Sequence, residues 1–297
     1  MGDDKEVTIL NRTLRHVGDG LEYHADEKHE AEIRADYGIG IDSKSLESPA
    51  EKDLQEGFDE DVDDPVLEKS DGRKYRATAA RANYLSIDRM DIQDAAKEAC
   101  RQMANPRESG NARLKRIARY VKKYPKLVWR FGRGGDIEDV IDVFSDSDWA
   151  ACRRTRKSTS GGVAMIDGGA IKHWSSTQGS VALSVGEAEY YALVKAAAEG
   201  IGMVSLGEDF GYKFRLRLWV DSNTAKAITS RLGLGKVRHL EVIYLWLQEA
   251  HRKKRFEIQK VAGVKNPADI LTKPLSATEM TEKLALVGAR FVDVRGS

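Results

Sequence analysis

Carboxylic acids occupy four places in the second half of this 297-residue sequence where a strand ends or a helix begins. They are Asp146 or Asp148 after a β-rich run, Glu187 or Glu189 in the first turns of a helix, Asp221 after a strand, and Asp269 at the start of a later helix. Taken singly, each acid is more simply explained as a cap. Taken together, the ends of two adjacent central strands and a helix over that edge would bring four carboxylates to one point.

Such a group of carboxylates has a definite chemistry. Clustered anions repel one another unless divalent cations lie among them. Because the ligands are hard oxygens without support from Cys or His, they favour Mg²⁺ or Mn²⁺. Two such ions about 4 Å apart can activate water and stabilise the leaving oxygen of a phosphodiester. The residue types therefore predict a metal-dependent nuclease site.

The segments around these acids predict an α/β fold with one mixed sheet, in the order β-β-β-α-β-α-α-β-α. The expected strands lie at 139–144, 163–166, 170–174, 216–220 and 256–261, and the expected helices begin near residues 184, 224, 240, 266 and 277. Trp149 and Trp174 are expected in the core rather than as platforms for stacked bases.

The composition bounds the class of protein. Charged residues make up 32% and hydrophobic residues 41%, which suits a globular protein with solvated linkers. No apolar run approaches the roughly 18 residues of a membrane span, so no membrane partner is expected. The N-terminus lacks the apolar core of a secretory signal. Cys100 and Cys152 are too few for a disulfide framework and are expected to be reduced thiols, which predicts an intracellular protein, cytoplasmic or nuclear.

The net charge of +1 conceals two blocks of opposite sign. Residues 47–71 contain eleven acids against two lysines and few large apolar groups, which predicts a disordered linker. Residues 72–131 contain sixteen Lys and Arg against five acids. A helix at 111–123 places apolar residues on one stripe and basic residues on much of the remainder. That basic side is either a polyanion-binding face or an ordinary solvated surface.

The first half of the chain carries weaker signals. Residues 7–14 and 20–23 predict a hairpin, and residues 26–37 predict a short helix. Asp88 is expected to cap a further helix that Asn105-Pro106 ends.

Five motifs, in order and spacing, resemble the ribonuclease H domain of Copia-type retrotransposon Pol polyproteins. They are SDSDWA at 145–150, RKSTSG at 156–161, GEAEY at 186–190, VDSN at 220–223 and ADILTKPL at 268–275. The preceding run, with ANYL at 82–85, RMDI at 89–92 and LKR at 114–116, is similar to the thumb-side end of that family's reverse transcriptase. Nothing resembles the Tyr-x-Asp-Asp polymerase motif, so no polymerase activity is expected from this chain.

The resemblance implies a fold and an organisation. The fold is α/β and ribonuclease H-like, with a five-stranded mixed sheet flanked by helices, preceded by a small α-helical reverse-transcriptase remnant. The parts are a remnant of the palm or connection at 1–46, an acidic disordered linker at 47–72, a basic helical thumb-like segment at 73–131, the ribonuclease H-like domain at 138–275 and a C-terminal tail at 276–297.

The resemblance also implies an activity and its residues. The family pattern assigns the catalytic, metal-binding carboxylates to Asp146, Glu189, Asp221 and Asp269. They would hold two Mg²⁺ ions, with Mn²⁺ as a possible substitute, to hydrolyse the RNA strand of RNA–DNA hybrids. Residues 262–266 lack the mobile histidine of many cellular ribonucleases H; His239 either substitutes for it or is an ordinary loop residue. The alternative function is a catalytically idle Pol remnant that binds nucleic acid or a protein partner, such as the rest of a Pol polyprotein or reverse transcriptase.

Contacts to the hybrid are expected from basic and hydroxyl side chains. Cations would bind phosphates, and Ser or Asn side chains would bond the backbone or a 2′-hydroxyl. The candidates are Arg153, Arg154, Arg156, Lys157, Ser158, Asn223, Arg116 and Lys122.

Overall fold

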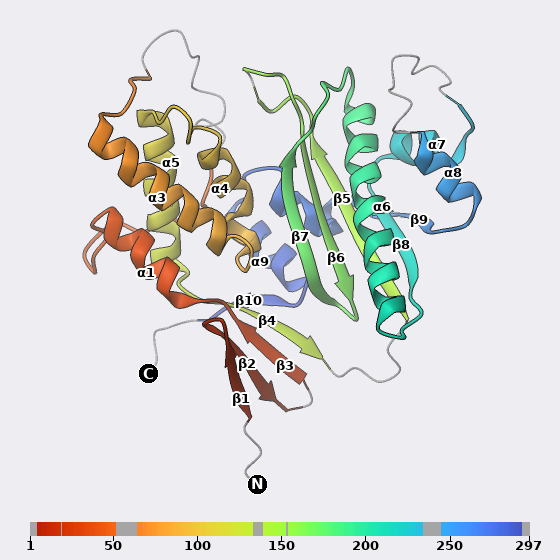
Figure 1. The fold of residues 1–297 in the computed structure, drawn as a ribbon, viewed down its shortest axis with the longest axis horizontal. Helices are drawn as coiled ribbons and strands as arrows, with labels where there is room; N and C mark the ends of the chain where they lie inside the picture. Colours follow the sequence, from red (N-terminus) through yellow and green to blue (C-terminus); the bar gives the residue numbers. More distant parts are fainter. Residues whose placement is uncertain are drawn as a thin grey trace. The chain divides into compact units, whose positions relative to one another are not determined.

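The structure is a computed structural model that describes residues 5–18, 20–51, 64–132, 139–152, 154–233 and 245–292. Figure 1 shows the fold. The chain forms two compact units. Unit 1 comprises Met1–Arg133 and Lys273–Ser297, and unit 2 comprises Gly134–Thr272. The range expected as a C-terminal tail, 276–297, falls in unit 1.

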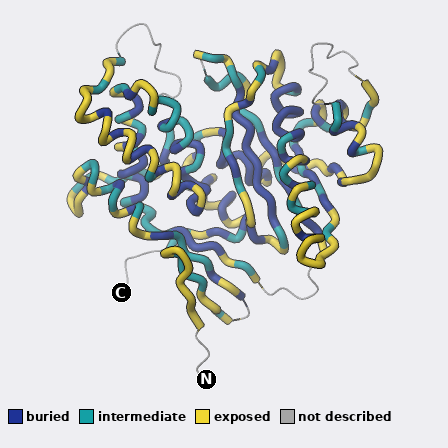
Figure 2. Tube along the Cα trace, in the orientation of Figure 1, coloured by how far each residue is buried: buried dark blue, intermediate teal, exposed yellow. Residues whose placement is uncertain are grey.

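Unit 1 contains an antiparallel sheet with strand order β1-β2-β3-β4-β10. Its strands are β1 (Glu6–Ile9), β2 (Arg12–Val17), β3 (Gly20–His24), β4 (Leu127–Gly132) and β10 (Ala289–Phe291). The first hairpin turns at Leu10 and Asn11, both with positive φ, as two-residue hairpin loops require. The prediction of one strand through residues 7–14 was therefore wrong, because the chain reverses in its middle. Figure 2 shows that β1 is exposed along its length.

The same unit contains helices, of which the first four pack on one another. They are α1 (Glu27–Asp36), α3 (Lys69–Leu85), α4 (Gln93–Cys100), α5 (Glu108–Lys123) and α9 (Ala277–Ala285), with a 3₁₀ turn at Met90–Ile92. Ile33, Tyr75 and Leu114 are fully buried between the first four helices. Asp88 does not cap α4, since its carboxylate accepts hydrogen bonds from Arg12 and Tyr23 instead. That expectation was wrong because a 3₁₀ turn separates Asp88 from the helix.

The described ends of the acidic segment, which belongs to unit 1, form bonds to helix α5 of the same unit. Glu51 forms a 2.5 Å ion pair with Arg116, and Glu47 pairs with Lys123. On the far side of the segment, Asp64 accepts hydrogen bonds from the backbone and hydroxyl of Ser109. The disordered linker was expected at 47–72. Residues 52–63 of that range lie outside the described residues, and residues 69–72 belong to α3. The described residues on both sides of 52–63 are bonded to α5.

Unit 2 contains the mixed sheet that the sequence predicted, with strand order β7-β6-β5-β8-β9. Its strands are β5 (Val140–Asp148), β6 (Thr159–Ile166), β7 (Gly169–Thr177), β8 (Arg215–Val220) and β9 (Glu257–Lys260). The first three pair antiparallel, and β8 lies parallel to both β5 and β9. The predicted α/β fold with a five-stranded mixed sheet flanked by helices is confirmed. Strands β6 and β7 are longer than predicted.

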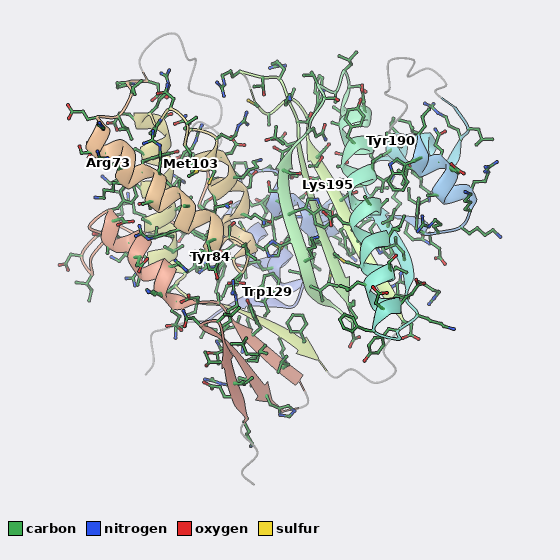
Figure 3. The ribbon with its side chains drawn as sticks, in the orientation of Figure 1. Arg73, Tyr84, Met103, Trp129, Tyr190 and Lys195 are labelled. Carbon is green, nitrogen blue, oxygen red and sulfur yellow. The ribbon has the colours of Figure 1, made fainter. Side chains whose placement is uncertain are left out.

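The helices of unit 2 follow from local sequence signals. They are α6 (Val185–Asp209), α7 (Asn223–Ser230), α8 (Trp246–Arg252), and the 3₁₀ helices η3 (Gly263–Lys265) and η4 (Pro267–Leu271). Ser184 caps α6 and Ser222 caps α7 through their side chains. Lys195 of α6 donates a 2.8 Å hydrogen bond to Ser176 of β7, so α6 lies over this sheet (Figure 3). The start of the helix expected from residue 240 lies outside the described residues.

The described part of the chain includes no helix with the length and apolar character that crossing a membrane requires.

Candidate functional site

Three carboxylates converge at one edge of the sheet in unit 2. Asp146 lies near the end of β5, Asp221 directly follows β8, and Glu189 projects from α6. Because β5 and β8 are parallel neighbours, their carboxyl ends meet at the same edge. One oxygen from each carboxylate lies within 4.8 Å of the other two. Asp146 and Glu189 are buried, and Asp221 is half-buried.

The geometry distinguishes the members of the two ambiguous pairs. Glu187 accepts hydrogen bonds from the backbone of Leu183 and from the hydroxyl of Tyr191, so it holds the start of α6. Glu189 lies two residues on and faces the carboxylate group. Among the described residues, Asp146 rather than Asp148 belongs to that group. The structure thus brings together Asp146, Glu189 and Asp221 of the predicted four.

Asp269 lies on η4, which packs against β5 and β6. Its side chain is buried, but its carboxylate is not part of the group of three. At the start of η4, the amide of Asn266 donates a 2.9 Å hydrogen bond to the backbone oxygen of Ser145. At its end, the hydroxyl of Thr272 donates to the carboxylate of Asp146. The role of Asp269 as a ligand stays a prediction.

Burial and mutual repulsion disfavour the ionised form of Glu189 in the group of three carboxylates. Burial raises the pKa of Glu189 to about 8, and repulsion from Asp146 and Asp221 adds to the rise. Ser147 opposes the rise by donating from its backbone and its hydroxyl to Oε1. The other oxygen, Oε2, is buried and has no hydrogen-bond partner among the described residues. Because a divalent cation would satisfy that oxygen and offset the repulsion, these residues fit one.

The predicted nucleic-acid contacts in unit 2 have different surroundings. Arg154 and Arg156 are exposed and Lys157 is half-buried, in a turn closed by backbone hydrogen bonds between Cys152 and residues 156–157. Ser158 is fully buried and its hydroxyl accepts from the backbone of Ala150, so it holds that turn and offers no surface to a duplex.

Three of the remaining candidates for nucleic-acid contact already have hydrogen-bond or ion-pair partners within the chain. Arg153 lies outside the described residues, as does His239. Asn223 is exposed and accepts a 2.7 Å hydrogen bond from Lys260. In unit 1, Arg116 pairs with Glu51, and Lys122 donates to two backbone carbonyls of residues 41–43. Nucleic-acid contact by these residues stays a prediction.

Several residues around the carboxylates were missed from the sequence. Ser147, Asn266 and Thr272 all bond to the carboxylates or to their strand. A signal was present, since each lies within or beside one of the motifs that carry the family resemblance. Trp174 is buried as expected, but Trp149 is 43% exposed and its indole donates to the backbone of Ala182, so its placement in the core was wrong.

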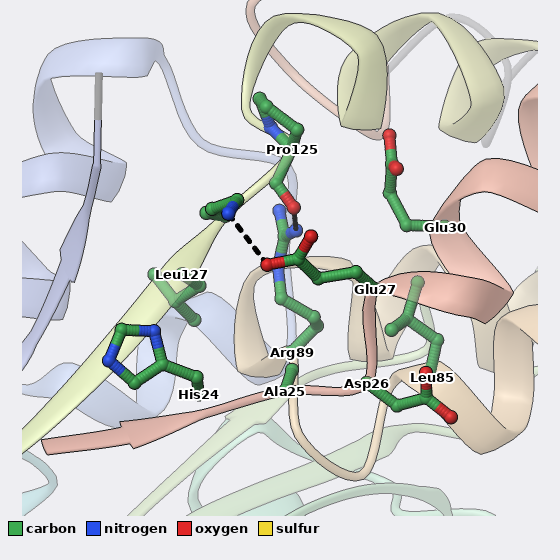
Figure 4. A pocket seen from close by; sticks show the side chains of 10 residues that line it. His24, Ala25, Asp26, Glu27, Glu30, Leu85, Arg89, Pro125 and Leu127 are labelled. Carbon is green, nitrogen blue, oxygen red and sulfur yellow. Dashed lines mark hydrogen bonds and ion pairs between the residues drawn. The ribbon is translucent and has the colours of Figure 1, made fainter. Parts of the chain in front are cut away.

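A small pocket in unit 1 is a weaker candidate (Figure 4). Arg89 lies beside it, almost fully buried, and donates to the backbone oxygen of Pro125. Its charge is neutralised by a bidentate pair with the equally buried Asp91, at 2.9 and 2.7 Å. Lys126 and Glu27 form an ion pair at the rim. The arrangement is that of a structural ion pair.

The amino-acid sequence is similar to those of transposon proteins. It is 30% identical over 215 residues to the retrovirus-related Pol polyprotein from transposon TNT 1-94 of Nicotiana tabacum, a match that covers 71% of this chain and 16% of the relative. It is 25% identical over 226 residues to the retrovirus-related Pol polyprotein from transposon RE1 of Arabidopsis thaliana, covering 75% of this chain and 15% of the relative. The chain therefore spans about a sixth of the length of these curated relatives.

Comparison of structures gives a likeness in fold. A solved structure of the foamy viral protease-reverse transcriptase in complex with dsDNA matches 88% of this chain and 45% of that chain, with a TM-score of 0.51 and 10% sequence identity. No family model matches the chain.

Proposed function

We propose that the chain is part of a retrovirus-related Pol polyprotein of a Copia-type retrotransposon, and that its unit 2 is a ribonuclease H that hydrolyses the RNA strand of RNA–DNA hybrids. The observation that carries the proposal is the group of Asp146, Glu189 and Asp221, two of them buried and the third half-buried, at the carboxyl edge of the five-stranded mixed sheet. A purely structural edge gains nothing from burying like charges side by side.

The side chains of unit 2 would divide the work. Asp146, Glu189 and Asp221 would hold the divalent cations, with Asp269 as a further ligand that the family pattern implies. Two bound Mg²⁺ ions, or Mn²⁺ in their place, would supply the Lewis acidity that activates water and stabilises the leaving oxygen. Ser147 fixes Oε1 of Glu189, and Oε2 is left without a hydrogen-bond partner among the described residues. The exposed Arg154 and Arg156 would bind phosphates of the hybrid.

Cleavage of a labelled RNA–DNA hybrid in Mg²⁺ tests the proposal. Asp146→Asn and Asp221→Asn each remove a charge from the group with little change of shape, and we expect each to lower the rate at least about 100-fold. Asp209→Asn is the matched control, since this exposed acid ends α6 in the same unit. Its rate should equal that of the unaltered chain.

Control duplexes test the specificity for hybrids, and two outcomes would contradict the proposal. Duplex DNA and duplex RNA should stay intact. Cleavage that survives both substitutions would place the activity elsewhere or in a contaminant. Binding of the hybrid without any cleavage would contradict the nuclease and support the idle Pol remnant, which binds nucleic acid or the rest of a Pol polyprotein.

A further inference from the structure

Thr272 lies beneath the carboxylate group and touches it directly. Its hydroxyl donates a hydrogen bond to Oδ2 of Asp146, and the backbone oxygen of Asp269 lies 3.3 Å away as a second acceptor. Thr272 is 1% exposed and Asp146 is 3% exposed, so water does not compete for this contact. A hydroxyl has one hydrogen to donate, and a carboxylate is a stronger acceptor than a backbone carbonyl. The bond to Asp146 is therefore the dominant one.

The same contact fixes the position of η4. This short helix is attached at its start by the bond between Asn266 and the oxygen of Ser145, and at its end by Thr272. It approaches β6 closely because residue 161 is a glycine: a Cβ there would lie 2.6 Å from the methyl group of Thr272. Asp146 is the pairing partner of Gly161 across the two strands. One threonine thus links the strand that carries Asp146 to the helix that carries Asp269.

We propose that Thr272 is a positioning residue for Asp146, whose hydroxyl holds the carboxylate in the orientation that binds the divalent cation. The torsion about the carboxyl end of an aspartate is broad, so the carboxylate rotates unless a donor fixes it. Repulsion from Glu189 and Asp221 favours rotation away from the group. A neutral donor opposes that rotation without adding a charge that would compete with the cation. Because Thr272 is buried, it acts through Asp146 rather than on the substrate.

The proposal rests on the nuclease function proposed above, in that both need a cation at Asp146. It makes a separate prediction, because the hydroxyl acts on cation affinity before any substrate is bound. Hydrogen-bonding partners of metal ligands typically contribute 10- to 100-fold in metal affinity or activity. We therefore expect loss of the hydroxyl to weaken Mg²⁺ binding about 10-fold in the absence of the hybrid.

Two nearly isosteric variants separate the hydroxyl from the shape of the side chain. Thr272→Val keeps the volume and removes the donor, whereas Thr272→Ser keeps the donor and removes the methyl group. Thr229→Val is the matched control, since Thr229 is also 1% exposed and its hydroxyl donates to the backbone oxygen of Ala225 in α7. Titration calorimetry with MgCl₂ on the full chain gives the affinity. A hybrid-cleavage assay then gives kcat and KM at several Mg²⁺ concentrations.

The expected result is weak Mg²⁺ binding and a lowered kcat for Thr272→Val, with KM for the hybrid unchanged, and near-normal values for Thr272→Ser and Thr229→Val. Equal Mg²⁺ affinity in Thr272→Val and the unaltered chain would overturn the proposal, as would a loss in Thr272→Ser that matches the loss in Thr272→Val. If Thr272→Val does not fold, Thr272→Ala replaces it, because alanine removes the same donor and leaves no methyl group to accommodate.

The two proposals fail in different ways. If the unaltered chain binds Mg²⁺ but does not cut the hybrid, and Thr272→Val still weakens Mg²⁺ binding, the nuclease is wrong and the positioning role stands. If the unaltered chain cuts the hybrid and Thr272→Val keeps the same Mg²⁺ dependence, the nuclease stands and the positioning role is wrong. Absence of Mg²⁺ binding by the unaltered chain would overturn the positioning role.

Discussion

Two groups of buried charged side chains show opposite electrostatic arrangements. In unit 1, Arg89 and Asp91 are both about 1% exposed or less and neutralise each other through a bidentate pair. In unit 2, Asp146 and Glu189 are buried beside Asp221, with charges of the same sign. A buried pair of opposite charge can be purely structural, whereas buried like charges cost stability and need a further reason. The contrast therefore favours unit 2 as the location of a functional site.

The cost of the carboxylate group leads to a prediction about Glu189. Glu189→Gln keeps the shape of the side chain and removes a carboxyl group whose pKa of about 8 in the folded state disfavours its ionisation at pH 7. Without divalent cations at pH 7, we expect this variant to raise the free energy of unfolding by about 1–3 kcal/mol, because the charged form of Glu189 is disfavoured in the folded state. Chemical denaturation in EDTA measures the difference.

Addition of Mg²⁺ should reverse the order of stability. The unaltered chain should gain stability with rising Mg²⁺, since the cation binds the folded state alone, and Glu189→Gln should gain much less. Glu199→Gln serves as the control: this acid also lies on α6 but pairs with Lys172 at 2.6 Å, on a half-exposed surface. A Glu189→Gln variant less stable than the unaltered chain in EDTA would mean that the cost of ionising Glu189 by burial and repulsion does not dominate at this position.

At the scale of single elements, local sequence patterns predicted the strands and helices of unit 2 but not the contacts between residues far apart in sequence. The strand runs, the start of a helix near Ser184 and the order of elements in unit 2 follow from periodicity and turn residues. The link between Thr272 and Asp146 spans 126 residues, so no local pattern contains it. Charge counts also could not show that Arg116 is already paired with Glu51, because a count does not identify partners.

Glycine at position 161 is the clearest element-level case, since its role depends on η4 from the far end of the domain. In Gly161→Ala, the new Cβ would meet the side chains of Thr272 and Leu271 at 2.6 and 2.9 Å and the backbone oxygen of Ala268 at 3.0 Å. We expect displacement of η4, a loss of about 1–3 kcal/mol in the free energy of unfolding, and loss of Mg²⁺-dependent stabilisation. Thermal unfolding with and without MgCl₂ measures both.

A second glycine provides the opposite expectation. Gly202 lies within α6, and a Cβ there would meet nothing within 4 Å. Gly202→Ala should therefore raise stability by about 0.5–1 kcal/mol, since alanine loses less backbone entropy in a helix.

For the prediction about Gly161, a normal Mg²⁺ response in Gly161→Ala would show that η4 has no part in the cation site.

At the scale of the whole molecule, the chain leaves unit 1, forms unit 2 and returns to complete unit 1. The returning segment supplies α9, whose Met280 and Leu284 are buried, and then β10. Strand β10 pairs with β4, and its Phe291 stacks on Tyr124 with ring centroids 4.3 Å apart. Because these contacts join residues far apart in sequence, unit 1 depends on a segment that follows the candidate nuclease in the chain.

Truncation tests this dependence. A chain ending at Thr272 loses α9 and β10 but keeps every described residue of unit 2. Each large apolar side chain withdrawn from the core costs about 1.5–3 kcal/mol, so losing several of them takes away a large part of the 5–15 kcal/mol that stabilises a typical domain. We expect hydrogen exchange in β4 to rise to the rate of an unfolded segment, while β5 keeps its protection and its further slowing by Mg²⁺. A chain ending at Val292, which retains all the described elements, is the control. Unchanged protection of β4 after the cut at Thr272 would show that unit 1 folds without the returning segment, and loss of protection in β5 as well would show that the two units unfold together.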